Sequence, residues 1–381
     1  MDCPNCGEAA PEDAKWCEAC GQDLNSEPLP ACVSCGEREV AEEGYCLSCG
    51  HKQPEERDHM EFDAGAAVGV TDRGKRHRHN EDAVAIGVTS DGTAVLVVCD
   101  GVSSTPGSAE ASLRASTAAR DLLLAGLEPA PVGAESAEDA VAAQDAVKGE
   151  NAAEIDVSAL LTRAVEAAQV EATATVIDGD GPEQSNAPHT DGGPPSSTFV
   201  AVVARPTIAE PDSTDSAGGT DGTDSTGSTE LATAWVGDSR AYWVGDESSR
   251  LTPVDHELEG SLVRWLGADS IDPTPDIALN TVSGPGHVVV CSDGLWRYAS
   301  DVGELAELVG RLVTDGKHGL GLASAMVDFA NEGGGHDNIS VALWSNVSNT
   351  AEDDPLTDAA DNGTDSDSTT SDAPAAESEN D

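Results

Sequence analysis

The sequence predicts an α+β protein built mainly on antiparallel sheets. Eight short apolar runs have the length and the composition of buried strands. Four longer runs, rich in alanine and leucine, indicate helices. Short, hairpin-like links join the later strands, which favours antiparallel pairing over a doubly wound parallel sheet. A chain of 381 residues has room for one large domain of this class and for small additional modules.

The first 50 residues contain a tandem repeat of cysteine pairs. Two tight turns that each carry a Cys-x2-Cys pair can close a tetrahedral zinc site, and a unit this short needs the metal as its core. We therefore expect a double zinc ribbon over residues 1–50 with two structural Zn²⁺ ions, and we favour it over disulfides or a redox pair. The expected ligands, displaced by 29 residues between units, are Cys3, Cys6, Cys17 and Cys20, then Cys32, Cys35, Cys46 and Cys49.

Zinc ribbons bind either nucleic acid or protein, and the charge of this one favours protein. Residues 1–52 hold 11 acidic residues against Lys15, Arg38 and Lys52, which disfavours contact with a phosphate backbone. We expect a protein partner at the ribbons and regard nucleic acid as the less favoured alternative. No signal peptide or membrane-spanning apolar run is visible, so we expect a cytoplasmic protein that does not bind membranes.

The whole chain is strongly acidic, with 71 Asp and Glu against 19 Lys and Arg. Such a balance indicates either disorder or a protein that folds in concentrated salt. The long apolar strand patterns argue against wholesale disorder. We therefore expect a halophilic protein whose self-repulsion is relieved by screening and bound cations.

The remaining elements follow the ribbons in order. Residues 51–63 are expected to be a linker, 64–345 a domain, and 346–381 a disordered acidic tail. The expected strands cover 66–71, 83–88, 93–99, 197–204, 231–236, 240–244, 287–291 and 339–344. The expected helices cover 108–126, 156–177, 303–314 and 320–331. Acidic insertions or disordered loops are expected at about 127–155, 178–196 and 206–230.

Five acidic islands lie beside the expected strands. Taken singly, each aspartate reads as an ordinary turn residue. Carboxylates that converge from several strand ends, however, need protons or cations between them, so the set predicts a hard-metal site. Cys99 and Cys291, next to two islands, are interpreted as small core residues. The islands are Asn80-Glu81-Asp82, Cys99-Asp100-Gly101, Gly237-Asp238-Ser239-Arg240, Ser292-Asp293-Gly294 and His336-Asp337-Asn338.

A basic cluster immediately precedes the first island. Guanidinium groups match phosphate oxygens, so this cluster favours an anionic substrate at a metal site. The alternative is a surface patch that pairs with nearby acids. The cluster consists of Arg73, Lys75, Arg76 and Arg78, with His77 and His79 between them.

The order of these motifs resembles that of a known enzyme family. The motifs are Thr71-Asp72-Arg73-Gly74 with Asn80-Glu81-Asp82-Ala83, Val97-Val98-Cys99-Asp100-Gly101, Ser197-Thr198, Trp235-Val236-Gly237-Asp238-Ser239-Arg240-Ala241-Tyr242, Leu251-Thr252-Pro253-Val254-Asp255-His256, Cys291-Ser292-Asp293-Gly294-Leu295 and Asp337-Asn338-Ile339-Ser340-Val341. Over about residues 64–345 the chain resembles the metal-dependent protein serine/threonine phosphatases of the 2C type. The resemblance implies a four-layer α/β/β/α sandwich, in which two antiparallel sheets are flanked by helices. It also implies a dinuclear Mg²⁺ or Mn²⁺ centre at one end.

The resemblance also implies roles for the island residues. Asp100 would bridge the two metal ions and the Gly101 carbonyl would ligate one of them. Asp293 and Asp337 match ligands of the second metal, so these two and Asp100 are the expected catalytic residues. All-oxygen ligation suits Mn²⁺ or Mg²⁺ better than zinc. The other expected ligands are the first-island acids Glu81 and Asp82, and Asp238 at a position linked to a third, weaker metal.

Two positions depart from the family pattern. The place of the phosphate-binding arginine falls on His77, so that role is shared among Arg76, His77 and Arg78. Val102 stands where some members carry a histidine that protonates the leaving group. The candidates for that acid are His77, His256, His336 and water.

The expected activity is hydrolysis of phosphoserine and phosphothreonine esters by a hydroxide held between two divalent ions. The expected substrates are phosphorylated proteins, and the expected role is signalling by dephosphorylation. The alternative is a pseudophosphatase adaptor that binds phosphoproteins without turnover. The altered phosphate-binding position and the missing Gly-Gly after Asp100-Gly101 favour this alternative, whereas the retained match at every metal-ligand position argues against it. A requirement for the divalent ion separates these alternatives.

Overall fold

The structure is a computed structural model. It describes residues 51–102, 107–129, 155–174, 193–207, 227–258 and 261–346. Within the first 50 residues it describes 3, 8, 9, 11, 14–16, 18, 19, 31–37, 40, 41 and 44–50. Most of the three expected insertions, and the expected tail beyond residue 346, lie outside the described residues.

One sheet has six strands in the order β1-β2-β15-β14-β8-β9, and all its neighbouring strands are antiparallel. Short connections join β1 to β2 and β8 to β9, as is usual for antiparallel neighbours. The strands are β1 (His59–Asp63), β2 (Ala67–Asp72), β8 (Arg240–Gly245), β9 (Ser249–Arg250), β14 (Gly286–Cys291) and β15 (Ile339–Ser345).

The second sheet has five strands in the order β13-β7-β6-β4-β3, again with antiparallel neighbours. They are β3 (Ala83–Val88), β4 (Ala94–Cys99), β6 (Phe199–Thr207), β7 (Ser228–Val236) and β13 (Asp276–Ser283). Two further sheets have two strands each. One pairs β5 (Ser196–Ser197) with β12 (Leu266–Gly267), and the other pairs β10 (Glu257–Leu258) with β11 (Ser261–Leu262).

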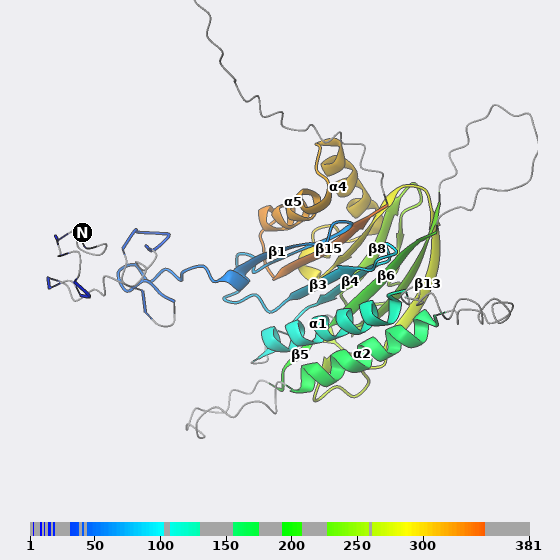
Figure 1. Ribbon diagram of the computed structural model, residues 1–381. Helices are drawn as coiled ribbons and strands as arrows, with labels where there is room; N and C mark the ends of the chain where they lie inside the picture. Colours follow the sequence, from blue (N-terminus) through cyan, green and yellow to red (C-terminus); the bar gives the residue numbers. More distant parts are fainter. Residues whose placement is uncertain are drawn as a thin grey trace, which may run out of the picture. The chain divides into compact units, whose positions relative to one another are not determined.

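Helices cover the outer face of each sheet (Figure 1). Helices α1 and α2 pack on the five-stranded sheet, and α3, α4 and α5 pack on the six-stranded sheet. No helix in the described part of the chain is long and apolar enough to cross a membrane. The helices are α1 (Ser108–Leu127), α2 (Val157–Ala174), α3 (Asp293–Trp296), α4 (Val302–Thr314) and α5 (Gly319–Glu332), with a 3₁₀ turn at Glu56–Asp58.

The core consists of three apolar layers, and the expected four-layer α/β/β/α sandwich is confirmed. Along β4, Val95 and Val97 face the α1–α2 layer, whereas Leu96 and Val98 face the layer between the sheets. Successive side chains of a strand point to opposite faces, so a strand covered on both faces must be apolar throughout. Burial on both faces therefore explains the uninterrupted apolar runs of the central strands.

The expected linker at 51–63 is too long. Residues 59–63 form β1, an edge strand of the six-stranded sheet, in which Phe62 packs partly buried against the core. Its alternating exposure leaves every second side chain in water, which hides the strand in a polar sequence. The expected insertion at 206–230 is likewise shorter, because β6 continues to Thr207 and β7 begins at Ser228.

Candidate metal centre

The antiparallel register brings the acidic islands together at the strand ends on one side of the sheets. In the five-stranded sheet Ala83 pairs with Cys99, so Asp82 and Asp100, one residue beyond each, lie next to each other. In the six-stranded sheet the end of β14 pairs with the beginnings of β8 and β15 in the same way. The end of one antiparallel strand faces the beginning of the next. The remaining islands flank the ends of β7, β14 and β15.

Hydrogen bonds from separate segments hold the first island in place. The Glu81 N–H donates to Asn338 Oδ1 at 2.9 Å, and Asn80 Nδ2 donates to Thr71 Oγ1 at 2.9 Å. Arg57 Nε donates to the Asn80 carbonyl at 2.9 Å. Arg57 belongs to the stretch that reads as a linker, so no sequence pattern marks it as part of the site. This network fixes the main chain that carries the first-island carboxylates.

Two island glycines are required because main chains approach each other closely. A Cβ atom at Gly101 would lie 2.3 Å from the Glu81 carbonyl oxygen. One at Gly294 would lie 1.9 Å from the Asn338 carbonyl oxygen. Any side chain at either position would push two islands apart. The Asp-Gly pairs therefore reflect packing of the islands against one another, and turn geometry alone does not account for them.

Burial and mutual repulsion raise the pKa values of four aspartates. Burial, with the charges of Asp337 and Asp293, raises the pKa of Asp82 to about 7. Burial also raises the pKa of Asp100 well above its usual range, and the other four aspartates add to the shift. The pKa of Asp238 is raised to about 7, mainly by burial, and burial also raises that of Asp293. Together with Asp337, these four aspartates form one electrostatic cluster from five separate segments.

The cluster fits a site for hard divalent cations. Asp82 Oδ2 and Asp293 Oδ1 are buried and have no hydrogen-bond partner. A buried carboxylate oxygen without a partner is costly, and Mg²⁺ or Mn²⁺ bound by oxygen ligands removes that cost. Among the described residues, only cysteines of the second ribbon form a group of possible ligand atoms all within 4.8 Å of one another. The looser grouping of the aspartates agrees with their mutual repulsion.

Among the described residues, His77 and Arg297 contact carboxylates of the cluster. His77 Nε2 lies 3.2 Å from Asp337 Oδ1. Arg297 Nε donates to Asp293 Oδ2 at 2.7 Å, and Arg297 Nη2 lies 2.6 Å from the same oxygen. Arg76 and Arg78, which share the expected phosphate-binding role with His77, are exposed. The sequence motifs do not single out Arg297, although its i,i+4 spacing from Asp293 suits an ion pair on one helical turn.

The three candidate histidines have different surroundings. His256 is buried, its Nδ1 accepts from the Gly237 N–H at 3.0 Å, and its Nε2 lies 3.0 Å from Asp276. His336 Nδ1 lies 2.7 Å from the Tyr298 hydroxyl. His77 is the one of the three for which the described contacts include a cluster aspartate.

We predict that raised aspartate pKa values make the fold less stable as pH rises when Mn²⁺ and Mg²⁺ are absent. Between about pH 4 and 7, folded Asp82 keeps a proton that the unfolded chain has lost. The folded state then binds more protons, so the free energy of unfolding falls over this range, by up to about 4 kcal/mol, and levels off above it. Thermal melts at constant high salt measure this slope.

The Asp82→Asn variant is the control for that prediction. It cannot titrate at this position, so its melting temperature should depend less steeply on pH than that of the wild type. Equal slopes for the two proteins would contradict the assignment of the slope to Asp82.

The second ribbon holds a cysteine cluster of the size that zinc requires. Cys32 Sγ lies 3.7 Å from Cys49 Sγ, and Cys35 Sγ lies 3.6 Å from Cys46 Sγ. Four sulfurs at zinc-bond length from one ion are about 3.8 Å apart. Desolvation opposes ionisation of Cys32, but hydrogen bonds from the main chain of Cys35 and Ser34 and from Gln53 outweigh it and lower its pKa to about 6.

The two ribbons also share a main-chain hydrogen bond at the first cysteine of each unit. The Cys3 N–H donates to the Glu8 carbonyl at 2.8 Å, as the Cys32 N–H does to the Glu37 carbonyl at 2.7 Å. Cys3 is also buried, like Cys32. The other expected ligands of this unit, Cys6, Cys17 and Cys20, lie outside the described residues.

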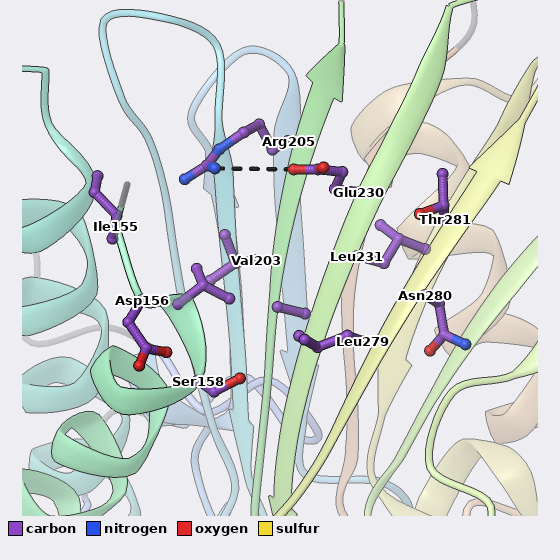
Figure 2. Close-up of a pocket in the computed structure, with 12 residues that line it drawn as sticks. Ile155, Asp156, Ser158, Val203, Arg205, Glu230, Leu231, Leu279, Asn280 and Thr281 are labelled. Carbon is purple, nitrogen blue, oxygen red and sulfur yellow. Dashed lines mark ion pairs between the residues drawn. The ribbon is translucent and has the colours of Figure 1, made fainter. Parts of the chain in front are cut away.

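A cavity of about 540 Å³ is lined by residues of β6, β7, β13 and the start of α2 (Figure 2). Its wall includes an ion pair between Arg205 and Glu230, whose nitrogen and oxygen are 3.8 Å apart. These residues pair across β6 and β7 six positions from the Phe199–Val236 pair at the aspartate end, a separation of roughly 20 Å. None of the expected site residues lines this cavity.

Comparisons with known proteins found similarities in both parts of the chain. Residues 3–50 match the family described as double zinc ribbon. The serine/threonine phosphatase Stp1 from Staphylococcus aureus is similar in structure, with 18% identity, a TM-score of 0.46, and coverage of 76% of this chain and 98% of that chain. The Mycobacterium tuberculosis phosphatase PstP is also similar, with 20% identity, a TM-score of 0.43, and coverage of 73% and 97%.

A further PstP structure, of its catalytic domain in complex with two manganese ions, gives 20% identity, a TM-score of 0.43, and coverage of 73% and 96%. No curated protein matches this sequence. The chain is thus similar to double zinc ribbons near its N-terminus and to bacterial serine/threonine phosphatases over 73–76% of its length.

Proposed function

We propose that the protein is a metal-dependent phosphatase that hydrolyses phosphoserine and phosphothreonine esters in proteins. The observation that carries this proposal is the cluster of five aspartates at the common edge of two sheets. Two of them, Asp82 and Asp293, present buried oxygens without hydrogen-bond partners. The order of the islands, which resembles that of the 2C-type phosphatases, supplies the reaction class.

The aspartates and their neighbours would hold the cations. Asp100, Asp293 and Asp337 would form the main ligand set. Bound Mn²⁺ or Mg²⁺ would activate a water molecule for in-line attack and neutralise charge on the phosphoryl oxygens. Cations displace the protons that the raised pKa values of Asp82 and Asp238 retain near neutral pH, so metal affinity should rise with pH. The further ligands in this proposal are Glu81, Asp82, the Gly101 carbonyl, and Asp238 for a third ion.

The site also needs a proton for the leaving oxygen. His77, 3.2 Å from Asp337, is the candidate histidine whose described contacts include the cluster. We therefore assign it as the acid that donates a proton to the leaving oxygen. His256 is committed instead to the Gly237 N–H and to Asp276, which fits a structural role.

The zinc ribbons complete the proposal as a docking module for a protein partner. Four cysteine ligands leave no open position on a zinc ion, so these sites would stabilise the fold of each ribbon. Reduced thiols are needed for this role, which accords with a cytoplasmic location.

We predict that the full chain releases phosphate from phosphoserine and phosphothreonine peptides in molar KCl with added Mn²⁺. The reaction should stop when the ion is chelated and resume when Mn²⁺ is restored, because the carboxylates alone repel the phosphate. A colorimetric phosphate assay measures this. Peptide binding without phosphate release, over a broad range of metals and salt, would identify a pseudophosphatase adaptor and refute the enzyme.

A further inference from the structure

An arginine outside the expected phosphate-binding set reaches into the carboxylate cluster from solvent. Arg297 directly follows α3 and contacts Asp293 Oδ2 through both Nε and Nη2. The Arg297 side chain is 57% exposed, whereas that of Asp293 is 11% exposed. The guanidinium therefore lies at the boundary between the buried carboxylates and the water from which a phosphorylated substrate would arrive.

The two oxygens of the Asp293 carboxylate have different surroundings. Oδ2 receives Arg297, while Oδ1 is buried and has no hydrogen-bond partner. A cation can bind Oδ1 without displacing the guanidinium. The pair with Asp293 uses Nε and Nη2 but not Nη1, so N–H groups of the fork stay available for a second anion. Arg297 can thus orient a metal ligand and bind substrate at the same time.

Charge and packing suit Arg297 to this position. Arg297 is charged at neutral pH, because a guanidinium does not lose its proton in proteins. Its Cζ lies 5.4 Å from the centre of the Trp296 ring, a contact that limits the movement of the side chain. An arginine held in this way loses little conformational entropy when it binds an anion.

The residues of the basic cluster are less suited to the task. His77 stands at the position where the family resemblance places an arginine, and a histidine cannot offer the planar fork that matches two phosphate oxygens. Arg76 and Arg78 are exposed, and the Arg78 carbonyl accepts a hydrogen bond from Lys52 Nζ at 2.8 Å. Neither guanidinium is among the described contacts of a cluster aspartate.

We propose that Arg297 is the phosphate-binding arginine of this site. It binds a non-bridging oxygen of the substrate phosphate while its Nε holds Asp293 in place. This inference rests on the proposed function. The inference goes beyond the proposed function because it assigns phosphate binding to Arg297, directly after α3, and not to the basic cluster before the first island.

The test compares Arg297→Ala and Arg297→Lys with the wild type, using the full chain in molar KCl. The control is Arg120→Ala, which removes a guanidinium that pairs with Asp121 on α1. Calorimetry gives the Kd of inorganic phosphate for the Mn²⁺-loaded proteins, and a separate titration gives the Kd of Mn²⁺. Phosphopeptide hydrolysis gives KM and kcat, and circular dichroism checks that each variant is folded.

We expect Arg297→Ala to weaken phosphate binding and raise KM by about 10-fold or more, because a charge-assisted hydrogen bond is lost. The phosphate Kd and KM of Arg297→Lys should lie between those of the wild type and of Arg297→Ala, because lysine keeps the charge but lacks the planar guanidinium fork. Mn²⁺ affinity should stay the same or increase in both variants. Arg120→Ala should match the wild type in every measurement.

An unchanged phosphate Kd in Arg297→Ala would overturn the inference. If Mn²⁺ binding became tighter while the phosphate Kd stayed constant, Arg297 would be a cation that competes with the metal, which also overturns it. The phosphate Kd does not depend on turnover. A wild-type protein that fails to hydrolyse phosphopeptides would refute the proposed function, and the comparison of phosphate Kd values would still decide the role of Arg297.

Discussion

Replacing Asp100 with asparagine is expected to abolish phosphatase activity and, at the same time, to stabilise the protein when divalent ions are absent. Burial and four neighbouring aspartates raise the pKa of this carboxyl, so its ionised form is unfavourable in the fold. An amide of the same shape removes that repulsion. It also removes the negative charge that the proposed metal ions require, so activity should fall by at least about 100-fold.

The opposite signs of these two effects distinguish a functional aspartate from a structural one. Phosphate release with Mn²⁺ measures activity, and thermal melts without divalent ions at pH 8 should show a melting temperature a few degrees higher than that of the wild type. Asp121→Asn, on the exposed face of α1, should change neither quantity, because exposed ion pairs contribute little. Loss of activity together with a lower melting temperature would show that Asp100 serves the fold instead.

The strands that the sequence predicts well are those covered on both faces. The run from Val95 to Cys99 is apolar at every position, because one side faces helices and the other faces a sheet. The strands β1 and β13 escape prediction because each is the edge of its sheet, with most side chains partly or fully exposed. Their pairing depends on partner strands elsewhere in the chain, which local composition does not record.

The candidate site shows the same division. The islands can be identified because an aspartate beside a glycine recurs after apolar strands, and the structure gives the glycines a packing role at Gly101 and Gly294. Arg57 and Arg297 have no such signature. The role of each depends on a distance to a main-chain or carboxylate oxygen that only the folded chain defines. A single basic residue outside a motif carries no sequence pattern that marks it as part of a site.

We expect the protein to lose its native structure in dilute buffer and to regain it in molar KCl. The formal net charge of −52 makes the compact state self-repulsive. The screening length is about 10 Å in 0.1 M salt and about 3 Å in 1 M salt, so only concentrated salt uncouples neighbouring surface charges. Far-UV circular dichroism over a KCl series measures the transition. A signal that is constant from dilute buffer to molar KCl would remove the halophilic interpretation.

Two separate salt effects should be visible in that series, because the charges lie in two environments. Surface carboxylates respond to ionic strength, so NaCl should replace KCl and an uncharged osmolyte such as sucrose should be less effective at restoring structure. The buried cluster is poorly screened and should respond to millimolar Mn²⁺ through binding. Asp100→Asn should therefore lose most of the stabilisation by Mn²⁺ and keep the response to KCl. If the variant lost both responses, the cluster would be the main source of the salt dependence and surface charge would be the minor one.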